Sequence, residues 1–184
     1  MPVATGTHRL GPDNATLQVR TFREGIASKA GHDLVIDVTR WEATLTVAQD
    51  PAQSAVELSA DPRSLEVREG VRGVKPLTDK DRAEIRRNID AKVLGDRPIS
   101  FRSDAVEVAG DGLSARGELT MAGASRPVSA RLALSPDGHV TGTIPLTQSE
   151  WGIKPYRGLM GALKVRDAVE VVLDARLDQP DDSA

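Results

Sequence analysis

The sequence contains three histidines, and they are scattered along the chain. His8, His32 and His139 lack the spacing of two or four residues that would let a pair share a metal ion. His32 precedes Asp33, and a histidine beside an acid can be a general base, a metal ligand or a head-group contact. Neighbouring strand residues point to opposite faces, so the two side chains need not touch. We expect His32 to be either a polar anchor inside the fold or a histidine satisfied in a turn, and we expect no metal.

A glycine-rich segment near the end of the chain gathers side chains suited to contact an apolar guest. Its apolar and aromatic members are Trp151, Tyr156, Leu159, Met160 and Leu163. The segment is either a mobile lid over a binding site, with methionine as an adaptable contact, or a long loop that covers one end of the fold. Arg157 lies within it and could bind a phosphate or carboxylate head group, although a solvated charge run is the alternative.

Several classes of chemistry lack their signatures. The chain has no cysteine, which excludes disulfides and thiolate sites. It has neither a G-x-S-x-G elbow nor a glycine-rich phosphate cradle. A net charge of −3 argues against broad nucleic-acid binding. We therefore predict a binding protein without a cofactor rather than an enzyme.

Location follows from the absence of targeting signals. No window approaches the roughly 20 apolar residues of a membrane span, and the first residues lack the basic and apolar regions of a signal peptide. We expect a cytoplasmic protein with no stable membrane insertion.

The elements that must position these residues are mostly strands. Apolar and polar residues alternate with a period of two, as in half-buried strands. The clearest runs are 41–47, 113–121, 128–134 and 169–177. Turn signals at 110–112 and 136–138 separate such runs. Because consecutive strands follow one another without helices, we expect antiparallel pairing.

One segment has the signals of a helix instead. Thr78 is a good N-cap, and acidic residues follow it in the first turn. Ile85 and Ile89 lie four residues apart on one face, and Gly95 ends the segment. We predict an amphipathic helix over residues 79–93, inserted between strands.

Nine or ten half-buried strands can pack as two sheets or close into a barrel, which removes unpaired edges. An eight-stranded barrel can be filled by side chains or can hold one small ligand. Inward positions here include many alanines, and only 3% of residues are aromatic, so volume is left over. That volume either closes as the sheets flatten or stays open for a guest. Trp41 and Phe101 are then either plain core residues or part of a cavity lining.

Five segments in order resemble the YceI-like family. They are residues 17–41, 83–102, 117–128, 148–153 and 163–171. The third reads G-E-L-T-M-A-G-A-S-R-P-V and resembles the family's hairpin pattern G-x-L-T-hydrophobic-x-G-x-[ST]-[KR]-P-V. The likeness covers roughly residues 7–177, although residues 31–34 differ from the common form. It implies an extended lipocalin-like barrel whose interior binds polyisoprenoid or fatty-chain ligands.

We therefore predict an all-β protein, an antiparallel lipocalin-like β-barrel with one inserted α-helix. A single domain covers residues 1–184, with its core at about 7–177 and a frayed tail at 178–184. The expected function is to carry an isoprenoid or other long-chain apolar ligand in the lumen. The side chains expected to contact it are His32, Trp41, Phe101, Trp151, Tyr156, Arg157, Leu159, Met160 and Leu163.

Two alternatives stay open. One is an enzyme that acts on such a ligand with His32 as general base, and the other is a filled barrel that serves as a stress-related structural or interaction module. A homodimer is an option for a barrel with exposed strands.

Overall fold

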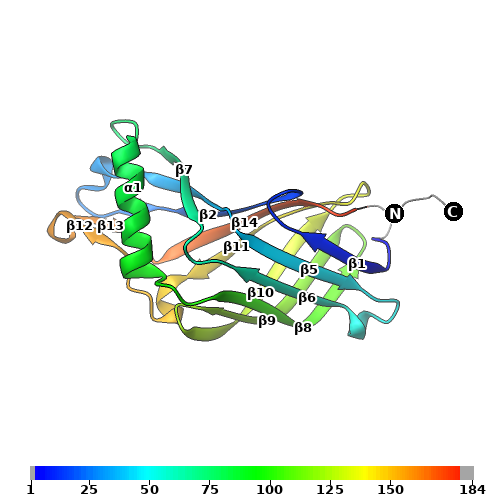
Figure 1. Cartoon of the computed structure of the whole chain (residues 1–184). Helices are drawn as coiled ribbons and strands as arrows, with labels where there is room; N and C mark the ends of the chain where they lie inside the picture. Colours follow the sequence, from blue (N-terminus) through cyan, green and yellow to red (C-terminus); the bar gives the residue numbers. More distant parts are fainter. Residues whose placement is uncertain (1–2, 179–184) are drawn as a thin grey trace.

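Antiparallel pairing between neighbouring strands builds most of the molecule, as a computed structural model that describes residues 3–178 shows (Figure 1). Eleven strands pair in the order β1-β5-β6-β8-β9-β10-β11-β14-β2-β4-β7. Their bounds are Gly6–Leu10 (β1), Ala15–Thr21 (β2), Asp33–Val38 (β4), Trp41–Val47 (β5), Ala55–Ala60 (β6), Leu65–Val71 (β7), Ile99–Ala109 (β8), Gly112–Met121 (β9), Ala124–Leu134 (β10), His139–Thr147 (β11) and Ala168–Arg176 (β14). The all-β, antiparallel prediction is confirmed.

The remaining elements are short. A small sheet has the order β12-β13-β3, with bounds Arg157–Gly158 (β12), Leu163–Val165 (β13) and Arg23–Glu24 (β3). Single turns of 3₁₀ helix are Ser28–Ala30 (η1), Pro51–Gln53 (η2), Gln148–Trp151 (η4) and Leu159–Gly161 (η5). The α-helix α1 spans Asp79–Asn88 and continues as a π-helical turn, η3, over Ile89–Val93. All but Asp178 of the tail expected to fray lies outside the described residues.

Two bends turn the linear strand order into a closed barrel. β4 continues through Thr39 and Arg40 into β5, and β6 continues through residues 61–64 into β7. These two long strands pair with each other on both sides of the bend, because β4 pairs with β7 and β5 pairs with β6. β1 and β2 form a third long strand, which pairs with β5 and β4. Counted in this way, eight antiparallel strands surround one interior, and the order closes on itself.

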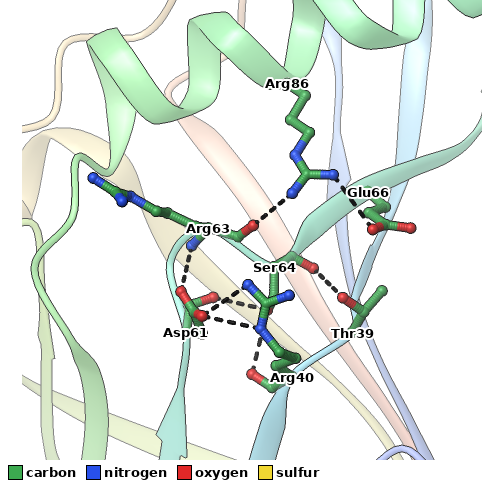
Figure 2. Close-up of polar contacts among 7 residues, drawn as sticks. All are labelled: Thr39, Arg40, Asp61, Arg63, Ser64, Glu66 and Arg86. Carbon is green, nitrogen blue, oxygen red and sulfur yellow. Dashed lines mark hydrogen bonds and ion pairs between the residues drawn. The ribbon is translucent and has the colours of Figure 1, made fainter.

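The joint where two of the long strands bend is held by hydrogen bonds around a fully buried serine (Figure 2). The hydroxyl of Ser64 lies 3.2 Å from the carbonyl oxygen of Arg40 and 2.8 Å from that of Asp61, and can donate to either. The ladder continues through the bend, because the Thr39 N–H donates to the Ser64 carbonyl and the Asp61 N–H donates to the Arg40 carbonyl. The backbone N–H of Arg63 and the guanidinium of Arg40 both donate to the Asp61 carboxylate, and they lower its pKa below the usual value.

The helix lies across one end of the barrel, beside β7 and the small sheet (Figure 1). Its start is a capping box, in which Thr78 and Asp81 each accept a hydrogen bond from the other's backbone N–H, so the predicted N-cap is confirmed. Arg82 donates to two backbone carbonyls of β7, and Arg86 donates to the carbonyl of Arg63 at the joint. Two arginines thus tie α1 to the barrel. Among the described helices, none is long and apolar enough to cross a membrane.

One seam of the barrel, between β10 and β11, is only partly hydrogen-bonded. β10 and β11 have eleven and nine residues, but their pairing covers only two residues of each. Pro127 in β10 and Pro145 in β11 have no N–H to offer along the unpaired stretch, and proline is typical of such edges. Trp151, which follows β11, donates its indole N–H to the carbonyl of Leu119 in β9 at 2.9 Å. This buried side chain connects the two sides of the seam.

Ser64→Ala tests whether the buried hydroxyl stabilises the joint. We expect the free energy of unfolding to fall by about 1 kcal/mol, because the hydrogen bond from this hydroxyl to the backbone at the bend is lost. Urea denaturation measures the change, and the control is Ser129→Ala at an exposed position of β10, which should stay within about 0.5 kcal/mol of the wild type. Equal effects of the two substitutions would contradict a special role for Ser64.

Candidate functional site

The interior of the barrel contains a cavity of about 640 Å³. This is within the range of pockets that enclose a small-molecule ligand. All eight strands contribute to its wall, mainly through aliphatic side chains. Representatives, one from each strand in chain order, are Val19, Ile36, Leu58, Phe101, Leu119, Val128, Ile144 and Val171. The interior faces of the strands therefore surround a space instead of interlocking.

One end of the cavity is closed by a separate apolar cluster. Six lining residues also pack in this cluster and form the floor: Val56, Phe101, Leu113, Ala115, Leu132 and Leu173. Behind the floor, buried side chains fill the barrel: Leu45, Val47, Val106, Leu134, Val140 and Leu177. Phe101 is the one aromatic member of the floor among the described residues. The floor has no polar side chain, so it can only meet the apolar part of a guest.

The polar lining residues lie toward the opposite end, which α1 and the small sheet cover. They are Thr21, Arg23, His32, Lys75, Asp81, Glu84, Asn88, Gln148, Tyr156 and Lys164. Most of them come from α1 and from the segments that flank it in space, and both signs of charge occur. Lys92 of η3 lies 5.6 Å from the centre of the Tyr156 ring, so the helix also contacts the segment that precedes β13. We call this polar end the mouth.

His32 lines the cavity at the mouth, but its ring is already engaged. Its Nε2 lies 2.5 Å from the carbonyl oxygen of Lys75. A carbonyl oxygen can only accept, so Nε2 carries the proton in this contact. The ring also lies against Gly73, where an added Cβ would clash with it. His32 therefore ties the segment between β7 and α1 to the start of β4.

Asp33 has different partners from its neighbour His32. Its buried carboxylate accepts a hydrogen bond from the backbone N–H of Arg23 at 2.8 Å and pairs with the Arg72 guanidinium at 3.3 Å. The two side chains of the His-Asp pair thus serve separate contacts. Among the described residues, no three histidine or acidic side chains gather as a metal site would need.

Asp81 faces the cavity from the first turn of α1. Hydrogen bonds from the backbone N–H and hydroxyl of Thr78 lower the pKa of the Asp81 carboxyl. Its role in the capping box accounts for this acid without any catalytic task.

The structure separates the side chains expected to contact a ligand into three groups. His32, Phe101, Tyr156 and Leu163 line the cavity. Trp41 and Trp151 are buried in the larger core cluster and are not among the lining residues.

In the third group, Arg157 and Met160 are exposed. The side chain of Leu159 lies outside the described part of the chain. Sequence analysis did not select Ile85 of α1 and Ile89 of η3, which line the cavity at the mouth. Their spacing of four residues indicated one apolar face, but not what that face would cover.

The family model for the YceI-like domain matches residues 12–177. This chain belongs to the YceI-like family. The fold is similar to the crystal structure of Burkholderia cenocepacia BcnA, with a TM-score of 0.62 and 16% identity over 87% of this chain and 94% of that one. A Campylobacter jejuni YCEI protein has a TM-score of 0.48 and 9% identity, over 78% of this chain and 84% of that one. The comparison with curated proteins finds no matching sequence.

These comparisons bear on the architecture of the YceI-like chain. At 16% identity, the likeness to BcnA shows the fold alone. The resemblance inferred from the five sequence segments is confirmed, as is the lipocalin-like barrel.

Ala130→Phe tests whether the cavity of this YceI-like barrel takes a ligand. Ala130 lines the cavity, whereas Ala133 of the same strand is exposed and provides a matched control. A ring at position 130 would displace at least two methylene groups of a bound chain, so we expect the Kd for a fluorescent fatty acid to rise more than about tenfold. Ala133→Phe should leave the fluorescence titration unchanged, and an equal loss in both variants would contradict lumenal binding.

Proposed function

We propose that this YceI-like protein binds one long apolar chain, of the isoprenoid or fatty type, in the lumen of the barrel. The observation that carries this proposal is a cavity with aliphatic walls, an apolar floor and polar residues toward one end only. A guest that matches this distribution has an apolar tail and one polar end. Its tail would extend toward Phe101, and its polar end would lie at the mouth near Lys75 and Tyr156.

The energetics favour a chain in such a space. Each buried methylene contributes about 0.8 kcal/mol, so ten of them contribute roughly 8 kcal/mol before the cost of association is subtracted. Few polar contacts are then needed for useful affinity. The walls also need little directional complementarity, because the hydrophobic effect depends on buried area and has no preferred direction.

We favour carriage over catalysis. The His32 Nε2 faces the carbonyl oxygen of Lys75, and Asp33 is engaged by Arg23 and Arg72. Neither side chain is therefore arranged as a general base toward the lumen. The cytoplasmic location and the homodimer stay predictions from the sequence.

A series of straight-chain fatty acids and isoprenoid alcohols of increasing length, titrated under native mass spectrometry, tests the proposal. We expect one chain per barrel, with affinity that rises about fourfold per added methylene until the chain reaches the floor. Phe101→Ala removes the ring from that floor, so the best-bound length should increase. The control is Phe22→Ala, because the Phe22 ring packs 5.9 Å from the Arg166 guanidinium and is not part of the lining. Absence of bound chain at every length would contradict the proposed function.

A further inference from the structure

The most exposed large apolar side chains of the described residues all lie at the mouth. They are Ile26 (98% exposed), Val74 (76%) and Met160 (fully exposed). Each belongs to a different segment, and we call residues 22–32, 72–78 and 152–167 the mouth loops. Single exposed apolar residues are ordinary, but their concentration at one end of a molecule indicates an interaction surface.

The three mouth loops form one continuous rim. The Ala27 N–H donates to the Ala162 carbonyl at 2.9 Å, and β3 pairs with β13, so the first loop contacts the third. His32 contacts the Lys75 carbonyl, so the first loop also contacts the second. All three loops contribute residues to the cavity lining. Figure 1 shows the small sheet and α1 together at this end of the barrel, away from β1.

Met160 combines an exposed side chain with an unfavourable backbone conformation. Its φ of 55° and ψ of 33° lie in the left-handed region, which favours glycine and asparagine. A methionine here is both strained and fully exposed in the protein alone. Such a feature favours a role in binding over a role in the fold.

The mouth loops are also strongly basic. Their basic residues are Arg23, Lys29, Arg72, Lys75, Lys154, Arg157, Lys164 and Arg166. Only Glu24 and Asp167 are acidic, so the loops carry six more basic than acidic residues. The whole chain has a net charge of −3, which leaves −9 for the rest of it. α1, next to the loops, adds four basic and three acidic residues and so does not reverse the sign.

We propose that the mouth loops dock reversibly on an anionic lipid membrane, with Ile26, Val74 and Met160 inserted at the level of the head groups. Basic residues that surround exposed apolar side chains match the charge and the apolar boundary of such a surface. An acidic protein partner would match the charge alone. The proposal rests on the proposed function in one respect: docking at the mouth would let an apolar chain pass between bilayer and lumen without crossing water.

Co-sedimentation at low salt tests this proposal, with vesicles of equal parts phosphatidylcholine and phosphatidylglycerol and with vesicles of phosphatidylcholine alone. We expect the wild type to bind the anionic vesicles and to be released by salt. The triple variant Ile26→Ser/Val74→Ser/Met160→Ser should bind them weakly. Each basic residue near an anionic surface contributes about fivefold to binding, so Lys154→Glu/Arg157→Glu should lower it more than about tenfold.

The matched control is Arg126→Glu/Arg131→Glu, the same charge change at exposed positions on the β10 wall. It should keep most of the vesicle binding. An equal loss of vesicle binding in this control would overturn the proposal, because binding would then depend on the net charge of the protein and not on the mouth loops. Full binding by the triple variant would overturn it too, as would equal binding to both kinds of vesicle.

Chain binding in solution separates this proposal from the proposed function. Native mass spectrometry should show that the mouth variants still take a chain in the absence of vesicles. A wild type that binds chains but no anionic vesicle would overturn membrane docking and leave the proposed function intact. A dimer that the triple variant abolishes, without vesicle binding, would assign the surface to a second copy of the chain.

Discussion

Two long strands bend together at the joint without breaking their ladder, because the N–H groups of Thr39 and Asp61 donate to the carbonyls of Ser64 and Arg40 across the bend, and the buried Ser64 hydroxyl adds a hydrogen bond there. The closed order of strands around the lumen depends on that bend. β4 pairs with β2 on its outer side, and β6 pairs with β8, so the continuity of β4 with β5 and of β6 with β7 joins the two ends of the sheet order. A sheet that failed to close could flatten, and its apolar faces would then meet and fill the space. Closure keeps those faces apart, because each strand is held at a fixed place around the interior by its neighbours.

The two ends of the lumen differ because different elements cover them. The far end is filled by buried aliphatic side chains such as Leu45, Leu134 and Val140. The mouth is covered by α1 and by the loops around the small sheet, and polar side chains come with them. Arg82 and Arg86 hold α1 through backbone carbonyls, so the helix can cover the mouth without inserting a wide apolar face.

The period of two located the strands, and Thr78 with its following acids located the start of α1, because both are local properties of the chain. The bends at Thr39–Arg40 and 61–64 were not predicted, since the alternating pattern runs up to them and a bend shared by two strands is a tertiary property. Alternation placed Trp41 and Phe101 alike on inward faces, yet only Phe101 borders the cavity. Trp151 was expected to contact a ligand, and its position across the partly unpaired seam depends on how far β10 and β11 separate.

The central claim is that the inward faces of these strands enclose an open apolar space that a chain-like molecule occupies. A crystal structure of the purified protein, determined without added ligand and again after soaking with a long-chain fatty acid, tests it most directly. The account predicts elongated electron density in the lumen, from the mouth toward Phe101, in at least the soaked crystal. Side chains interlocked from the floor to α1, with no space for a chain in either crystal, would contradict it.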